Sequence, residues 1–355
     1  MSKRVAIMGA SGYSGEELVR LLLHHPHADL VAVTSRQSAG QSVAQVFPRF
    51  ASDPKARALR FTEPDAAALA RVADVVFLAL PHGVAAEFAV PLLEAGRVVI
   101  DLSADFRLRN AATYQEFYAH AHPAPALLPG AVYGLPEVYR AEIARARLIA
   151  SPGCYPTSIL LPLIPLLRSG LVRPGGIIAD SMSGVSGAGR KAEVDYLFCE
   201  CNESLRAYGV PKHRHLSEIE EQLSFAAGQP VVIQFTPHLV PVHRGIHTTL
   251  YVAPAEAFHT AEAAADLGRR IADCYASAYA NEPFVRVLEG KAMPDTKNVV
   301  GTNFLELAWR LDPRTGRLVI LSAEDNLVKG ASGQAVQSFN ILSGFPETAG
   351  LLGHI

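Results

Sequence analysis

Cysteine and tryptophan are scarce in this chain of 355 residues, which has four of the first and one of the second. None of the cysteines forms a C-x-x-C pair, and Cys199 and Cys201 lack a second ligand pair for a zinc site. The sequence therefore predicts no metal site. With few cysteines and no secretory leader before the first strand, we expect a protein of the reducing cytoplasm.

Two further absences narrow the class of protein. Lysine and arginine number 32 against 34 aspartates and glutamates, and a net charge of −2 provides no general attraction for nucleic acid or membrane surfaces. No window approaches the roughly 18 apolar residues of a membrane span, since prolines and an arginine interrupt the run 160–171. We expect small-molecule partners, and neither nucleic acid nor membrane.

The first part of the chain has the pattern of a doubly wound α/β domain. Residues 16–25 have the apolar periodicity of a helix. Short apolar segments predict buried strands at residues 3–8, 30–34, 75–80 and 98–102. Because such strands alternate with helices, we expect a parallel sheet covered on both faces, a Rossmann-type domain over residues 1–150.

The pattern changes after residue 150. Longer strand candidates follow at residues 176–181, 231–237, 245–252 and 318–323. Fewer helices separate them, which predicts an α+β catalytic and substrate domain with a mixed or antiparallel sheet over 151–325. The tail 326–355 is predicted to be a loop and a helix that pack back on the first domain.

One cysteine stands in a tight turn, Pro152-Gly153-Cys154, after a short apolar strand and before a long apolar segment. A helix that starts here would leave the sulfur of Cys154 at its N-terminus, where the partial positive charge favours a thiolate. A thiol of pKa about 8.5 is only about 3% ionised at pH 7, so lowering its pKa creates a nucleophile. The alternative is a cysteine packed as a small hydrophobe.

A glycine-rich turn joins the first strand to the first helix. Its spacing, G-x-x-G-x-x-G, is one residue off the usual dinucleotide fingerprint. Glycines let the backbone approach a pyrophosphate, and the helix N-terminus receives its charge. The alternative is a plain tight turn. We expect cofactor contacts from Gly9, Ser11, Gly12, Tyr13, Ser14 and Gly15.

The end of the second strand lacks the carboxylate of an NAD site. Ser35 and Arg36 stand there instead, and this pair suits the 2′-phosphate of NADP(H). A second glycine- and serine-rich loop offers Ser183, Gly184 and Gly187 as backbone contacts for a phosphate or cofactor. The alternatives are a solvated arginine and a flexible hairpin.

Several polar residues are candidates for chemistry. His213 and His215 precede Ser217 and Glu220, whose spacing predicts a capping box and a helix start. A histidine near a helix N-terminus is disfavoured as imidazolium, which suits acid–base work near neutral pH. The residues themselves do not choose between the two histidines.

Three polar residues are placed for binding anions. Ser103 and Arg107 follow the fourth strand, at the sheet edge where ligands of such folds bind. Arg244 lies between two strands of the second domain and is a candidate clamp for carboxylate or phosphate. For both arginines the alternative is a surface ion pair.

The segment Pro152-Gly153-Cys154-Tyr155-Pro156-Thr157 resembles the active-site signature of the N-acetyl-gamma-glutamyl-phosphate reductase family. The one small departure is Ser158, where that family usually has glycine or alanine. Other matching segments follow in family order, at residues 9–15, 80–83, 101–107, 213–219 and 326–330.

The resemblance implies an NADPH-dependent enzyme of arginine biosynthesis that reductively dephosphorylates N-acetylglutamyl 5-phosphate to its semialdehyde. It implies that Cys154 is the nucleophile that forms a thioester, and it favours His215 over His213 as acid–base. Pro81, His82 and Asn326 join the expected cofactor contacts. Inorganic phosphate is a reactant of the reverse direction, and a homodimer or homotetramer is expected.

Three alternatives compete with this reading. One is a reductase of carrier-bound aminoadipate phosphate, which resembles this chain but has Cys-Asn-Ala at its nucleophile, so Tyr155-Pro156 favours the arginine branch. Aspartate-semialdehyde dehydrogenase fits the motifs less well. A non-catalytic NADP(H) sensor explains the glycine turn and Arg36 but not the cysteine turn, the histidines and the arginine loops together.

Overall fold

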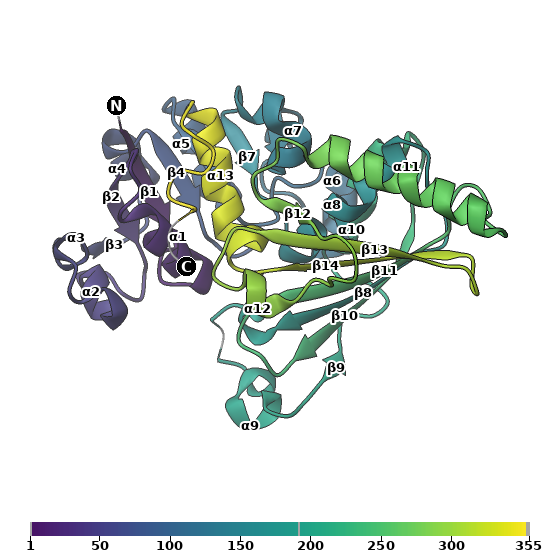
Figure 1. Ribbon diagram of the computed structural model, residues 1–355. Coiled ribbons are helices and arrows are strands. Elements are labelled where there is room, and N and C mark those ends of the chain that lie inside the picture. The colour runs from purple at the N-terminus through teal and green to yellow at the C-terminus, as the bar shows by residue number, and fades with distance from the viewer. Residues whose placement is uncertain (1, 191, 353–355) are drawn as a thin grey trace. The chain divides into compact units, whose positions relative to one another are not determined.

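The computed structural model describes residues 2–190 and 192–352, which form two compact units (Figure 1). The first unit takes its described residues from Met1–Gly153 and Ala331–Ile355, and the second from Cys154–Gly330. Among the described residues, no helix combines the length and the apolarity needed to cross a bilayer.

The first unit contains a seven-stranded sheet in the order β3-β2-β1-β4-β5-β7-β6. All of its strand pairs are parallel, as the alternating pattern predicts. The predicted Rossmann-type fold of this unit is confirmed. Its strands are β1 (Lys3–Met8), β2 (Ala28–Thr34), β3 (Phe61–Thr62), β4 (Val75–Leu78), β5 (Val98–Asp101), β6 (Ala131–Tyr133) and β7 (Leu148–Ala150).

Helices cover both faces of this sheet. Phe77 of the fully buried β4 meets Phe339 of α13, with ring centroids 5.9 Å apart. Val76 instead joins a core that includes Ala89 of α5, because alternate residues of a strand face opposite sides. The helix α13, yellow in Figure 1, also packs against α1 and α7. The helices are α1 (Tyr13–Leu22), α2 (Val43–Val46), α3 (Pro54–Ala58), α4 (Ala66–Val72), α5 (Ala85–Glu94), α6 (Ala111–Tyr118), α7 (Pro136–Ile143) and α13 (Gly333–Leu342).

The second unit contains a seven-stranded mixed sheet, in the order β12-β13-β14-β11-β8-β10-β9. The pairs β8/β10 and β12/β13 are parallel and the other four are antiparallel, which confirms the expected mixed sheet. Its strands are β8 (Ile177–Gly184), β9 (Arg206–Ala207), β10 (Ile233–Val240), β11 (Ile246–Val252), β12 (Val285–Val287), β13 (Leu305–Asp312) and β14 (Arg317–Glu324).

The helix that begins at the candidate nucleophile runs through two prolines. Pro162 and Pro165 lack N–H groups, which frees the carbonyls of Ser158 and Leu161 four residues earlier. The hydroxyl of Ser322 donates to the Ser158 carbonyl at 2.7 Å, and that of Tyr279 donates to the Leu161 carbonyl. Tertiary partners therefore satisfy the helix at both breaks. The helices of this unit are α8 (Cys154–Arg168), α9 (Phe198–Cys201), α10 (Leu216–Ala227), α11 (Ala261–Tyr279) and α12 (Thr296–Val299).

Candidate active site

Cys154 is the first residue of α8, four positions after β7 ends at Ala150. Cys154 takes part in no disulfide within the described residues, and it is half-buried. The first-turn N–H groups of a helix carry partial positive charge, which stabilises a thiolate at this position. Gly330 lies directly against it: a Cβ built on Gly330 would be 2.9 Å from Cβ of Cys154. Sequence reasoning matched Gly330 only as part of a motif, because its contact with Cys154 joins residues far apart in the chain.

The two candidate histidines stand before α10, but the predicted capping box is wrong. The helix begins at Leu216, and His215 is its N-cap without a side-chain cap bond. Ser217 donates its hydroxyl to the carbonyl of Arg214 at 2.8 Å. Glu220 accepts the N–H of Ile233 at 3.1 Å, at the start of β10. The Glu220 carboxylate that the capping box required therefore binds the backbone of β10 and not the start of its own helix.

A cluster of rings surrounds these histidines. Tyr155, the second residue of α8, has its ring centroid 5.6 Å from His213 and 5.9 Å from His215. Its hydroxyl lies 2.8 Å from the hydroxyl of Tyr208. The residue that follows the nucleophile therefore contacts both histidines, so the structure brings Cys154, His213 and His215 to one region of the second unit.

In the glycine turn between β1 and α1, glycine is present at each position for a different structural reason. A Cβ on Gly9, whose φ is +82°, would lie 2.3 Å from the carbonyl oxygen of Ala79. A Cβ on Gly15 would lie 2.5 Å from Cα of Ala10, so Gly15 lets α1 approach the turn closely. Gly12, the N-cap of α1, has only the Gly9 oxygen within 4 Å, at 3.9 Å. The chain's own packing does not require glycine there, and a helix N-terminus whose N-cap makes no side-chain cap bond fits a dinucleotide pyrophosphate.

The remaining residues of this turn connect to the end of β2. The hydroxyl of Ser11 lies 2.8 Å from that of the buried Ser35. Arg36 comes next, is exposed, and has no hydrogen bond or ion pair within the described part of the chain. Tyr13 and Ser14 form the first turn of α1, and the Ser14 carbonyl accepts a bond from Ser332 at 2.9 Å.

Two buried carboxylates that the sequence did not single out are Asp101, the last residue of β5, and Asp105 in the segment after it, and Asp101 holds Ser103. Ser103 donates its N–H and its hydroxyl to Asp101, at 2.9 and 2.8 Å. Burial and the charge of Asp105 raise the pKa of Asp101 to about 7. Asp105 accepts the N–H groups of Gly83 at 2.7 Å and Ala86 at 3.1 Å, next to the start of α5.

The loop with Pro81 and His82 follows β4. Pro81 is exposed, and Nδ1 of His82 accepts the N–H of Ala104 at 3.0 Å. Arg107 is buried, and its Nε donates to the carbonyl of Ser151 at 2.8 Å while Nη2 donates to that of Leu102 at 2.9 Å. The guanidinium of Arg107 therefore joins the ends of β5 and β7, and it is not a surface cation.

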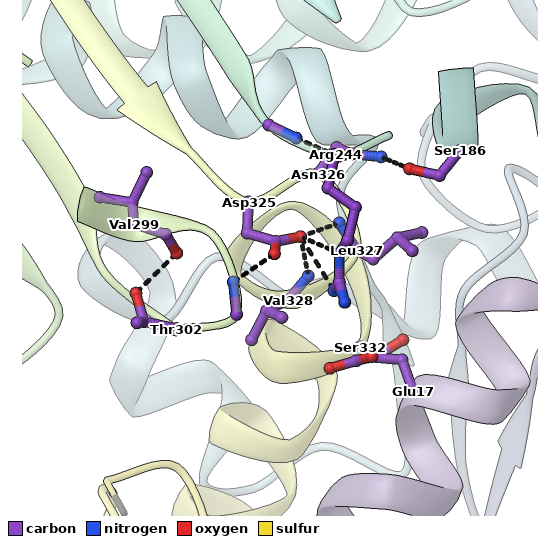
Figure 2. A network of polar contacts seen from close by, with 12 residues as sticks. Glu17, Ser186, Arg244, Val299, Thr302, Asp325, Asn326, Leu327, Val328 and Ser332 are labelled. Atoms are coloured by element: carbon purple, nitrogen blue, oxygen red, sulfur yellow. Dashed lines mark hydrogen bonds and ion pairs between the residues drawn. The ribbon is translucent and has the colours of Figure 1, made fainter. Parts of the chain in front are cut away.

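The candidates of the second unit near β14 belong to one polar network (Figure 2). Asn326 accepts the N–H of Gly245 at 2.8 Å and donates to the hydroxyl of Ser186 at 3.0 Å. Arg244 donates to Asp325, a fully buried residue that sequence reasoning missed. Asp325 directly precedes a motif that the sequence analysis matched only as a whole, so no separate signal identified it.

The first residues of the second glycine-rich segment are the last residues of β8. Ser183 and Gly184 are its last two residues, and a Cβ on Gly184 would lie 2.8 Å from the backbone nitrogen of Arg244. A Cβ on Gly187 would lie 3.1 Å from Oγ of Ser183. Both glycines allow close packing, so this loop is not an open hairpin. Among the described residues, no group of three or more potential metal ligands is found.

Both units match domains of the semialdehyde dehydrogenases. Residues 4–146 match the family model of the semialdehyde dehydrogenase NAD binding domain, and residues 154–326 match that of the semialdehyde dehydrogenase dimerisation domain. Among solved structures, aspartate semialdehyde dehydrogenase II of Vibrio cholerae is similar in fold, with a TM-score of 0.70 at 19% identity over 97% of this chain and 99% of that one. The enzyme of Candida albicans with NADP has a TM-score of 0.68 at 16% identity, over the same shares of the two chains.

Curated relatives are similar over nearly their whole length. The N-acetyl-gamma-glutamyl-phosphate reductase of Akkermansia muciniphila is 58% identical over 349 residues, 98% of each chain. That of Geobacter sulfurreducens is 50% identical over 351 residues, 99% of this chain and 98% of the relative. The chain therefore belongs to the N-acetyl-gamma-glutamyl-phosphate reductase family of the semialdehyde dehydrogenases.

Proposed function

We propose that this chain catalyses the NADPH-dependent reductive dephosphorylation of N-acetyl-L-glutamyl 5-phosphate to N-acetyl-L-glutamate 5-semialdehyde, a step of arginine biosynthesis. The observation that carries the proposal is full-length identity of 48–58% to reductases of that name. The placement of Cys154 at the start of α8 supports it, because the reaction needs an ionised nucleophile.

Cys154 carries out the first half of the reaction. Its thiolate attacks the carbonyl carbon of the acyl phosphate, a C–S bond forms, and the C–O bond to phosphate breaks. Phosphate leaves and a thioester remains on the enzyme. Backbone N–H groups of the α8 first turn are suited to stabilise the oxyanion that develops on the carbonyl oxygen. Ser103, Arg107 and Arg244 are the proposed ligands of the substrate phosphate and carboxylate.

The second half needs a hydride and a proton. The nicotinamide cofactor, when bound, supplies the hydride that reduces the thioester carbonyl. His215 then protonates the sulfur as the thiohemiacetal oxyanion collapses and the C–S bond breaks, so the aldehyde leaves and Cys154 returns as a thiol. In the reverse direction His215 removes that proton, so one residue serves both directions.

The proposed cofactor ligands form one set in each unit. In the first unit they are Gly9, Ser11, Gly12, Tyr13, Ser14, Gly15, Ser35, Arg36, Pro81 and His82, and in the second they are Ser183, Gly184, Gly187 and Asn326. The N-terminus of α1, with glycine as its N-cap, suits the pyrophosphate. The exposed Arg36 beside the buried Ser35 suits the 2′-phosphate of NADP(H), because a free guanidinium pairs with a dianion.

A homo-oligomer is part of the proposal, as a homodimer or a homotetramer. The second unit matches a dimerisation domain. Between residues 194 and 205 this unit has four large apolar side chains that are more than half exposed, which is typical of a surface that another subunit covers. They are Val194, Leu197, Phe198 and Leu205. Light scattering on the purified protein tests this: a monomer at micromolar concentration contradicts it. None of the four cysteines forms a disulfide within the described part of the chain, which supports a reducing, cytoplasmic location.

The experiment that tests the activity runs the reaction backwards. Purified protein receives NADP, inorganic phosphate and N-acetylglutamate semialdehyde, and the formation of NADPH is followed by the absorbance of the reduced nicotinamide. Parallel reactions contain aspartate semialdehyde or omit phosphate. We expect activity with N-acetylglutamate semialdehyde and none with aspartate semialdehyde, and we expect it only when phosphate is present. Activity with aspartate semialdehyde alone, or with neither compound, contradicts the proposal.

A further inference from the structure

The rings of His213 and His215 lie with their centroids 4.9 Å apart. Nδ1 of His213 accepts the backbone N–H of His215 at 3.1 Å. We propose that His213 is a positioning residue that stays neutral and holds the backbone of His215 through Nδ1, so that His215 alone exchanges the proton. This inference rests on the proposed function, because it divides the roles of that reaction.

The hydrogen bond defines the form of His213. An imidazolium carries hydrogens on both nitrogens and cannot accept at Nδ1. His213 must therefore be the neutral tautomer with its proton on Nε2 for this bond to exist. Protonating His213 would break the bond and put two N–H groups face to face. The backbone of His215, the N-cap of α10, would lose the contact that sets its direction.

Packing around His213 prevents the ring from turning away. Three aromatic rings meet it edge to face, those of Tyr208 at 5.5 Å, Tyr155 at 5.6 Å and Phe235 at 5.6 Å between centroids. A Cβ on Gly209 would lie 3.0 Å from Cδ2 of His213, so the chain passes close by on that side. Rotation of the ring to another rotamer would require the surrounding residues to move.

The charges around His213 also favour the neutral form. Burial, with a smaller contribution from the Arg214 cation, lowers the pKa of His213 to about 4. Burial raises the pKa values of Tyr155 and Tyr208, so both facing phenols stay uncharged. The other titratable groups of this cluster are His215 and Cys154, and the Cys154 charge acts on both tyrosines. Above about pH 5 we therefore expect a neutral His213.

Three variants test the division of roles. In His213→Asn the oxygen Oδ1 lies the same number of bonds from Cα as Nδ1 of histidine, so it can accept the N–H of His215 but cannot titrate. His213→Leu has similar bulk and no acceptor. His215→Asn removes the proposed acid–base group. For each variant, kcat, KM and the pH profile of the phosphate-dependent reaction are measured, together with NADP binding and the melting temperature.

We expect His213→Asn to keep kcat within about threefold of the wild type and to keep the shape of the pH profile. His213→Leu should lose roughly tenfold or more in kcat with NADP binding unchanged, because His215 is no longer held. His215→Asn should lose on the order of a hundredfold or more, the range of a lost general acid–base. A loss in His213→Asn as large as in His215→Asn overturns the proposal, since a non-titrating acceptor would then not suffice.

Other outcomes are equally decisive. If His213→Leu matches the wild type, the hydrogen bond has no role in positioning. If His213→Leu does not fold, ¹⁵N spectra of the histidine rings in the wild type still test the tautomer: protonation of His213 above pH 6 overturns the proposal. An inactive wild type would instead contradict the proposed function, and the spectra would remain a test of the neutral ring.

Discussion

Arg244 donates two hydrogen bonds to a single carboxylate oxygen of Asp325, from Nε at 3.2 Å and from Nη2 at 3.1 Å (Figure 2). The same oxygen accepts the N–H groups of Leu327 at 2.8 Å and Val328 at 3.1 Å. The other oxygen accepts the N–H of Gly301 at 2.6 Å. One buried carboxylate thus orients the guanidinium of Arg244 and joins three separate loops of the second unit.

We expect Asp325→Asn to destabilise the protein by about 3 kcal/mol or more. The substitution leaves the largely buried Arg244 without its countercharge, and removing one partner of a buried ion pair typically costs about 3–5 kcal/mol. Urea unfolding measures the effect. Asp266→Asn breaks the exposed pair with Arg269 and serves as the control, with an expected change below about 1 kcal/mol. Equal effects of the two substitutions would contradict the structural role of Asp325.

Cys154→Ser should bind NADP normally and lose about a thousandfold or more of its turnover. A serine hydroxyl is not ionised near neutral pH, so the thioester cannot form at a comparable rate. Cys199→Ser changes an exposed free cysteine and is the matched control. Steady-state kinetics and NADP titration measure both properties. Near-normal turnover of Cys154→Ser would rule out the covalent mechanism.

Gly330→Ala should slow both turnover and alkylation of Cys154. The new methyl group would lie 2.9 Å from Cβ and 3.2 Å from Cα of Cys154, and neither atom belongs to a flexible chain end. Overpacking of this kind costs about 1–3 kcal/mol, so the melting temperature should also fall. Gly175→Ala is the control, since nothing lies within 4 Å of its Cβ and its φ is not positive. Unchanged kinetics in Gly330→Ala would show that Cys154 has room to shift.

Arg36→Ala should reduce the preference for NADPH over NADH by roughly tenfold. A unit charge pair at about 4 Å contributes roughly 4 kcal/mol at an effective dielectric of 20, and a third of this value corresponds to a factor of ten. The ratio of kcat/KM values for the two cofactors measures the change, and Arg57→Ala tests for a general effect of removing an exposed cation. If the ratio stays constant in Arg36→Ala, another residue reads the 2′-phosphate.

Because Asp101 loses its proton, the free energy of unfolding should decrease as the pH rises from about 4 to about 7. Burial and the neighbouring Asp105 raise its pKa from 3.8 to about 7, so the folded chain binds a proton that the unfolded chain releases. The stabilisation is complete below the unfolded pKa and is lost as pH passes through the folded one. A difference of one in pKa between the folded and unfolded chains corresponds to about 1.4 kcal/mol of stability.

Asp101→Asn should flatten this part of the pH profile of the melting temperature. Its amide oxygen can still accept the N–H of Ser103, so the local hydrogen bond persists. Asp29→Asn, at an exposed position of β2, is the control and should leave the slope unchanged. A slope that survives in Asp101→Asn would assign the titration to another group.

Local patterns were enough to predict much of the first unit. The apolar segments at 3–8 and 98–102 became β1 and β5 within one residue, because buried parallel strands are continuous in sequence. The two-residue β3 and the three-residue β6 are too short to show a pattern, and they exist through pairing with β2 and β7. In the second unit β13 was missed, although its eight residues pair along all of β14.

The sequence by itself determined the positions where a local conformation is needed. A glycine turn before α1 and a Pro-Gly turn before Cys154 follow from backbone geometry between neighbouring residues, and so does the helix N-terminus at the thiol. The tertiary structure alone decided which side chains meet. Glu220 accepts a hydrogen bond from Ile233 and does not cap its own helix. Asp325 accepts a hydrogen bond from Arg244, which lies 81 positions away in the sequence. These contacts depend on how strands and helices pack, because a hydrogen bond is made by atoms close in space, whatever their separation along the chain.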